Sequence, residues 1–177
     1  MTVNLYFPFR YGFIPIMILY LGALRYYNNY EMLEGKRSEE EVNYLMDLFI
    51  KGFTKDSNYF ADKNIKVVFS GRKEPLNDKV YDAMKSLENL TKDCTGGTLN
   101  ICLNYGGQTE MVDAAKKVAE DYKNNNLNLD ELTPELLYKY LYNELPPIDL
   151  LIRTSGEVRI SNFMLYSIAY AELHFTS

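Results

Sequence analysis

Short apolar runs alternate with helix-like segments over most of the chain, and this alternation constrains the fold more than any other feature. Three runs are typical of short buried strands: residues 65–69, 98–103 and 148–152. Segments with apolar residues at helical spacing separate them. Strands that alternate with helices at this spacing predict βαβ units, and therefore an α/β fold with a parallel sheet flanked by helices.

Two helices are predicted around the first strand. Ser38 and Glu41 form a capping box, in which each side chain can bond the backbone N–H of the other residue. Apolar residues follow at helical spacing as far as Phe53. A second helix is predicted from Asn77 or Asp78. Its inward face comprises Val80, Met84, Leu87 and, as a further candidate, Leu90.

Three more helices are predicted in the second half of the chain. The first runs from about Thr109 to Tyr122, and its apolar stripe comprises Met111, Ala115, Val118 and Tyr122. The next begins after Thr133, because threonine is a favoured N-cap and proline, here Pro134, is favoured in the first turn. The last is predicted over residues 161–173, where apolar residues surround most of the helix axis.

The amino-terminal segment has a different character. Fourteen uncharged residues run from Tyr11 to Leu24, between two arginines. The run is too short for a spanning helix and Pro15 interrupts it. It also lacks the basic start and the cleavage site of a secretory signal. We predict a buried or interfacial segment, with contact to a membrane surface or an ill-fitting start of the chain as the alternatives.

Charge and cysteine content exclude several classes of protein. The chain has 19 Lys and Arg against 24 Asp and Glu, which gives a net charge of -5. This charge argues against a protein that binds duplex nucleic acid. Cys94 and Cys102 form neither a disulfide framework nor a metal cluster, so a cytoplasmic setting is expected. His174 is the single histidine, which leaves little scope for a histidine triad or a multi-histidine metal site.

The end of the third predicted strand carries the most informative constellation. In parallel α/β sheets, ligands bind beyond the carboxyl ends of the strands. Arg153, Arg159 and Ser161 follow this strand and directly precede the predicted helix 161–173. A helix amino terminus favours an anion, and two guanidinium groups add bidentate phosphate recognition. The spacing predicts a diphosphate site; the alternative is that both arginines pair with Glu157 on a solvated loop.

The same residues carry a family resemblance. The run DLLIRTSGEVRISNF at residues 149–163, continued by AYAEL at 169–173, closely resembles the last signature of the cis-prenyltransferases of the undecaprenyl diphosphate synthase type. Three further stretches fit this family in the same order, at residues 36–42, 64–67 and 95–107. The resemblance divides the chain into a divergent apolar segment, 1–34, and an incomplete cis-prenyltransferase-like domain, 35–177.

The resemblance implies a function. Such enzymes use Mg²⁺ and add isopentenyl diphosphate in cis to an allylic prenyl diphosphate, with the product growing in a hydrophobic tunnel. They work as dimers, so a homodimer, or a heterodimer with an intact synthase, is expected. A cytoplasmic enzyme acting on a lipid carrier can also contact a membrane peripherally.

The resemblance also implies site residues. Arg153, Arg159 and Ser161 match the group that holds isopentenyl diphosphate. Glu172 matches the carboxylate associated with the metal, and Arg37 an arginine near the reacting centre. Asn104 matches the strand-end turn; it is a further substrate-binding candidate, although its position favours a structural role.

The chain departs from the family pattern at the amino end. The opening motif Asp-Gly-Asn-Gly-Arg-Trp is absent, and the first aspartate is Asp47. The expected domain thus lacks the family's usual first strand, and it lacks the usual C-terminal end. Because the missing aspartate is the principal metal carboxylate, weak or absent turnover is expected. The alternatives are a catalytically silent homologue that partners an intact synthase, or an eroded gene product.

Overall fold

The computed structural model describes residues 2–9, 12–19, 50–51, 57–74, 76–154 and 156–176. The helix predicted after Ser38 lies outside the described residues, except for Ile50 and Lys51, which are helical. Arg37 also lies outside the described residues.

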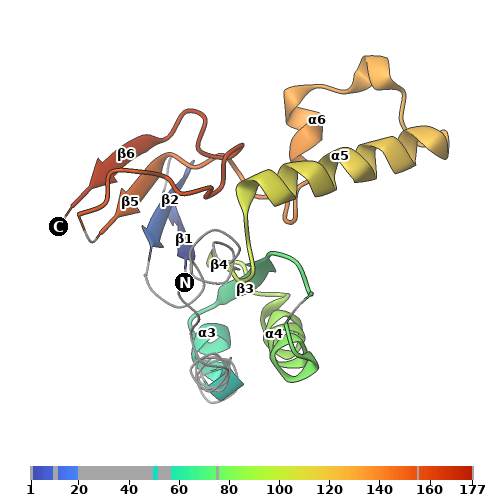
Figure 1. Cartoon of the computed structure of the whole chain (residues 1–177). Coiled ribbons are helices and arrows are strands. Elements are labelled where there is room, and N and C mark those ends of the chain that lie inside the picture. Colours follow the sequence, from blue (N-terminus) through green and yellow to red (C-terminus); the bar gives the residue numbers. More distant parts are fainter. Residues whose placement is uncertain are drawn as a thin grey trace, which may run out of the picture.

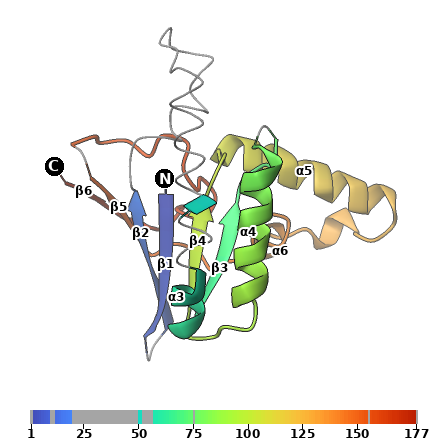
Figure 2. The ribbon, with the colours of Figure 1, turned by 90° about the horizontal axis from the view of Figure 1, so that it is seen from below.

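Within the described residues, six strands form one sheet in the order β3-β4-β1-β2-β5-β6 (Figures 1 and 2). Their bounds, in chain order, are Thr2–Phe9, Gly12–Leu19, Ile65–Ser70, Gly97–Cys102, Leu150–Arg153 and Glu172–Phe175. The pairs β3–β4, β2–β5 and β5–β6 are parallel, whereas β1 is antiparallel to both of its neighbours. The predicted α/β fold, with parallel strands and flanking helices, is confirmed.

The amino-terminal residues supply the two central strands. β1 and β2 form an antiparallel hairpin whose last pair is Phe9 with Gly12. β1 pairs with β4, and β2 pairs with β5, so the hairpin joins the two outer parts of the sheet. Residues 12–19 of the apolar run predicted to be buried or interfacial therefore pair with β1, and residues 16–19 also pair with β5. The division at residue 34 stays a prediction.

Helices α3 (Ser57–Asp62) and α4 (Asp78–Thr91) pack against β3 and against each other. The Asn77 side chain caps α4 by accepting a hydrogen bond from the Val80 N–H. The predicted inward residues Val80, Met84 and Leu87 are buried with Ala83, while Leu90 is 46% exposed, so its inward assignment is wrong. They form one apolar core with side chains of β3, of β4 and of the residue that follows β4: Val67, Phe69, Leu99, Ile101 and Leu103.

Side chains of α4 also cover the free edge of β3. The Val67 N–H donates to Thr91 Oγ1 at 2.9 Å, and the Phe69 N–H donates to Glu88 Oε1 at 3.0 Å. Thr91 in turn donates its hydroxyl to the Leu87 carbonyl. Unpaired strand edges invite pairing with other chains, and α4 satisfies these donors instead.

Helix α5 (Gly107–Lys123) projects away from the sheet, with α6 (Pro134–Tyr138) alongside it (Figures 1 and 2). A short 3-10 helix, Leu129–Glu131, lies between them in the chain, and Thr133 caps α6 as predicted. The buried stripe of α5 differs from the predicted one: it comprises Gly107, Glu110, Ala114 and Val118. Val118 is buried as predicted, whereas Ala115 and Tyr122 are exposed, so the predicted stripe is right at Val118 and wrong at these two residues.

The helix predicted over residues 161–173 is wrong. Ser161, Asn162 and Met164 have φ angles of 48°, 61° and 44°, in the left-handed region that a right-handed helix cannot contain. The chain instead turns repeatedly over residues 161–170 and then enters β6. Phe163, Met164, Ile148 and Leu151 bury their side chains in a second apolar cluster, which explains the apolar composition of the segment.

Candidate functional site

The residues from Arg153 to Met164, here called the arginine loop, begin at the carboxyl end of β5. The Arg153 side chain is 1% exposed. Its Nη1 donates to the Arg159 carbonyl and, at 2.8 Å, to Ser161 Oγ. A buried guanidinium needs such partners, because an ion without them is costly away from water. These bonds fix the plane of the guanidinium.

Glu157 brings the two arginines of the loop together. Its Oε2 lies 3.4 Å from Arg153 Nη2 and also forms an ion pair with Arg159 Nη2. Arg159 is 58% exposed and Glu157 is 34% exposed. The structure thus assembles Arg153, Arg159 and Ser161, as the sequence predicted. It also shows the pairing with Glu157 that the sequence offered as the alternative, but with Arg153 buried rather than on a solvated loop.

No helix begins at Ser161, so the predicted contribution of a helix amino terminus at that residue is wrong. The arginine loop instead packs against the amino terminus of α5. The Gly107 N–H donates to the Asn162 carbonyl, and the Gln108 N–H donates to Asn162 Oδ1, both at 2.8 Å. The positively charged side chains of the loop are those of Arg153 and Arg159.

Asn104 connects the carboxyl ends of β3 and β4. Its Nδ2 donates to the carbonyls of Arg72 and Glu74 at 2.9 and 2.6 Å, and its φ of 51° is one that asparagine tolerates. Gly71 lies so close to this turn that a Cβ there would be 1.8 Å from the Leu103 carbonyl oxygen. These contacts give Asn104 a structural role in the turn; its role in substrate binding stays a prediction.

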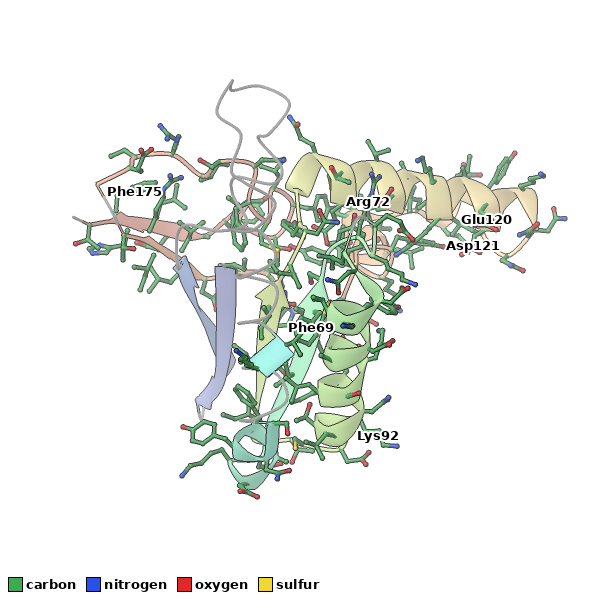
Figure 3. All side chains as sticks on the ribbon, turned by 60° about the horizontal axis from the view of Figure 1, so that its bottom comes forward. Phe69, Arg72, Lys92, Glu120, Asp121 and Phe175 are labelled. Carbon is green, nitrogen blue, oxygen red and sulfur yellow. The ribbon has the colours of Figure 1, made fainter. Side chains whose placement is uncertain are left out.

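Arg72 holds the same turn against α5 (Figure 3). Its Nε and Nη2 donate to the two carboxylate oxygens of Asp113 at 2.7 and 2.6 Å. The Tyr142 hydroxyl donates to Asp113 Oδ2 at 2.6 Å. The bidentate bond to Arg72, with the Tyr142 bond, lowers the pKa of Asp113 to about 2. The sequence carried no signal for this contact, because Asp113 lies 41 positions away from Arg72.

A buried carboxyl group, that of Glu110, is connected to the arginine loop through Tyr105. Glu110 is 4% exposed; it accepts hydrogen bonds from the Tyr105 hydroxyl and from the Tyr142 N–H. Burial raises the pKa of Glu110 and, together with Glu110 nearby, that of Tyr105. The Tyr105 ring packs on Phe163 of the loop at 5.8 Å between centroids. Sequence reasoning missed Glu110, because the predicted apolar stripe of this helix did not include its position.

Glu172 lies far along the sheet from Arg153. In the β5–β6 register Glu172 pairs with Leu150, whereas Arg153 pairs with Phe175, which is labelled on β6 in Figure 3. Three residues of strand separate the two positions by about 10 Å. Glu172 is exposed at the start of a strand, so its predicted place on an apolar helix is wrong.

The described ranges offer no group of three His, Cys, Asp or Glu side chains that could hold a metal ion. One exposed carboxylate does not fit a resident Mg²⁺, so the described residues alone do not form the implied metal site. The metal-binding role of Glu172 stays a prediction. Within the same ranges, no helix has the length and apolar composition needed to cross a bilayer.

Comparisons with known proteins identify the family. Residues 29–177 match the prenyltransferase family described as "Putative undecaprenyl diphosphate synthase". The tritrans,polycis-undecaprenyl-diphosphate synthase (geranylgeranyl-diphosphate specific) of Pyrococcus horikoshii is 45% identical over 143 residues, 79% of this chain and 54% of the relative. The isoprenyl transferase of Fusobacterium nucleatum is 43% identical over 140 residues, 79% of this chain and 58% of the relative.

Solved structures agree. Lavandulyl diphosphate synthase from Lavandula x intermedia, in complex with dimethylallyl diphosphate, aligns with a TM-score of 0.74 and 29% identity, covering 80% of this chain and 62% of that one. This chain spans less than two thirds of the length of each of these three relatives. The family match and the shared fold confirm the resemblance found in the sequence: the chain belongs to the undecaprenyl diphosphate synthase family of prenyltransferases.

Proposed function

We propose that this chain binds isopentenyl diphosphate at the arginine loop and condenses it in cis with an allylic prenyl diphosphate, with weak or no turnover in the 177 residues. The observation that carries the proposal is the meeting of Arg153, Arg159 and Ser161 in one loop. The names of the relatives, which are undecaprenyl-diphosphate synthases and isoprenyl transferases, support the reaction class. The dimethylallyl diphosphate complex of the structural relative supports the ligand class.

The loop has the charge and the geometry for a diphosphate. Two guanidinium groups against the single carboxylate of Glu157 leave a net positive charge at this place. Arg153 is held by neutral acceptors at Nη1, and its Nη2 faces Glu157. A diphosphate carries more charge and more acceptor oxygens than a carboxylate, so it can replace Glu157 between the arginines with stronger charge-assisted bonds.

The two arginines have different roles in this proposal. Buried Arg153 is rigid, because its guanidinium is bonded to the Arg159 carbonyl and Ser161. It therefore orients the diphosphate and, through it, the isopentenyl group. Exposed Arg159 can rotate away from Glu157 and close over the bound ligand. Arg37 remains proposed near the reacting centre, and Asn104 remains a further candidate for substrate contact.

Turnover is proposed to be weak for an electrostatic reason. Departure of diphosphate from the allylic carbon develops negative charge on the leaving oxygens, which cations must stabilise. We propose Mg²⁺ as this cation and Glu172 as a carboxylate associated with it, but the Asp-Gly-Asn-Gly-Arg motif is absent from the sequence. Loss of several kcal/mol of transition-state stabilisation lowers the rate by roughly a thousandfold or more.

The absence of this motif favours a second candidate function. In it, the chain is a catalytically silent homologue that binds prenyl diphosphates and pairs with an intact synthase. The assembly is a homodimer in the first function and a heterodimer in the second. In both functions we propose that the protein is cytoplasmic. Peripheral contact with a membrane would occur where the lipid product is released.

Labelled isopentenyl diphosphate, farnesyl diphosphate and Mg²⁺ incubated with the full chain test the proposal. We expect isopentenyl diphosphate to bind in a calorimetric titration while elongation is slow or absent. Elongation at an ordinary enzyme rate, on the order of 1 to 10 per second, would contradict weak turnover. Absence of isopentenyl diphosphate binding would contradict the function itself. Co-purification with an intact synthase would favour the second candidate.

A further inference from the structure

The amino terminus of α5 is capped by a residue from the arginine loop. Asn162 accepts two hydrogen bonds from this terminus, at its carbonyl from Gly107 and at its side-chain Oδ1 from Gln108. The first N–H groups of a helix have no partner within the helix, so they need acceptors from elsewhere. Here the acceptors come from a residue 54 positions along the chain, which joins the helix to the loop.

The backbone at Asn162 determines where its neighbour points. Ser161 and Asn162 are left-handed, with φ angles of 48° and 61°. Asparagine adopts this conformation more readily than most residues, because its short side chain can form local hydrogen bonds. Ser161 then presents Oγ to Arg153 Nη1 at 2.8 Å. The contact that fixes the guanidinium is therefore made by the residue next to the helix cap.

The close packing at Gly107 leaves the loop little freedom. A Cβ on Gly107 would lie 2.7 Å from Leu165 Cγ and 3.1 Å from the Asn162 carbonyl oxygen. On the other side, Phe163 and Met164 are buried in the apolar cluster that includes Leu151 of β5. The loop is thus held between the end of α5 and the core.

We propose that Asn162 is a positioning residue for diphosphate binding: by capping α5 it holds Ser161 and Arg153 in the geometry that receives the ligand. The inference rests on the proposed function of the arginine loop. Asn162 itself need not touch the ligand, because both of its observed acceptor groups are bonded to α5.

Matched variants of two helix caps test this inference in the full chain. Asn162→Ala removes the Oδ1 acceptor, and Asn162→Gly does so while keeping the left-handed backbone accessible. Asn162→Asp keeps an acceptor for the Gln108 N–H, and its negative charge suits a helix amino terminus. Asn77→Ala is the control, since Asn77 caps α4 through the same kind of bond. Isopentenyl diphosphate titration and amide hydrogen exchange of residues 156–164 are measured for each variant.

We expect Asn162→Ala and Asn162→Gly to bind isopentenyl diphosphate roughly tenfold more weakly and to exchange faster in the loop. Asn162→Asp should retain slow exchange, and Asn77→Ala should change neither property. Unchanged binding and exchange in both Asn162→Ala and Asn162→Gly would overturn the inference, as would equal effects of Asn77→Ala. If the unsubstituted chain binds no isopentenyl diphosphate, the proposed function fails, and exchange alone then decides whether Asn162 positions the loop.

Discussion

The two ends of the sheet are held together by different kinds of contact. At the β3 end, α4 packs a continuous apolar core against β3 and β4, and Phe69 lies inside it (Figure 3). At the β5 end, the arginine loop is irregular. It is held by the bond that Arg153 donates to Ser161 Oγ, by the bond that Asn162 accepts from the Gln108 N–H of α5, and by a smaller apolar cluster. The first end is built for stability, and the second end places polar groups for a ligand.

This difference predicts separable responses to mutation. An apolar core loses stability when volume is removed, and it does so regardless of ligand. A loop held by polar contacts loses geometry, and with it ligand affinity, when one acceptor or donor is removed.

The largest loss is expected for Leu87→Ala at the α4 end. Leu87 is 1% exposed in the apolar core, so truncation leaves a cavity and lowers the free energy of unfolding by about 3 kcal/mol. Urea denaturation measures this change. Leu90→Ala is the control on the same helix and should lower it by less than about 0.5 kcal/mol. Equal effects of the two substitutions would show that α4 does not pack as described.

A smaller loss is expected for Arg153→Ala at the loop end. The substitution removes the donor to the Arg159 carbonyl and to Ser161 Oγ in a buried place, which costs about 2 kcal/mol. Arg159→Ala shares the Glu157 partner but is exposed, so it should cost less than about 0.5 kcal/mol. Urea denaturation of both variants checks this order. The reverse order would contradict the burial of Arg153.

The edge of β3 provides a third, smaller test. Thr91→Val keeps the side-chain shape but removes the acceptor for the Val67 N–H and the donor to the Leu87 carbonyl. We expect a loss of about 1 kcal/mol of unfolding free energy, with faster hydrogen exchange at Val67. Unchanged exchange at that amide would indicate that α4 does not cover the edge.

The smallest effects are expected in the pH dependence of stability. The pKa of Glu110 is raised by burial, so the folded chain binds this proton more tightly and the Glu110 contribution falls as pH rises above 4.5. Glu110→Gln should abolish this decline. Asp113 has the opposite sign: its pKa falls from 3.8 to about 2, so its contribution is present above pH 3.8 and is lost as pH falls toward 2.

Urea denaturation between pH 2 and pH 7 of the unsubstituted chain, Glu110→Gln and Asp113→Asn separates these two contributions. The difference in unfolding free energy between the unsubstituted chain and Asp113→Asn should change with pH only below pH 3.8. The corresponding difference for Glu110→Gln should change only above pH 4.5. Difference curves that change in the same pH range would contradict the assigned pKa directions.

The sequence predicted the α4 end better than the loop end, because regular elements carry local signals. Apolar spacing and the Asn77 cap located α4, and the apolar runs located β3 and β4 within one or two residues. The central hairpin was not predicted as strands. β1 and β2 pair with each other locally, but their other partners, β4 and β5, lie more than 75 positions away. No local pattern therefore reveals the central place of the hairpin in the sheet.

The candidate site was predicted in its residues but not in its geometry. Arg153, Arg159 and Ser161 were expected together, and they are together. The helix expected after them is absent, because Ser161 and Asn162 are left-handed to meet the end of α5. An apolar segment packed from several sides looks helical in sequence even when it forms turns. Glu110 was missed because the predicted buried stripe of α5 did not include it. Asp113 was missed because its partners Arg72 and Tyr142 are distant in the chain.

A titration of isopentenyl diphosphate into the full chain and into Arg159→Ala tests the central claim most directly. Arg159 is exposed, and its removal should leave the fold intact, so a change in affinity reports on the site. We predict that the full chain binds and that Arg159→Ala binds roughly tenfold more weakly or worse. Equal affinity of the two proteins, or no binding by either, would contradict a diphosphate site at the arginine loop.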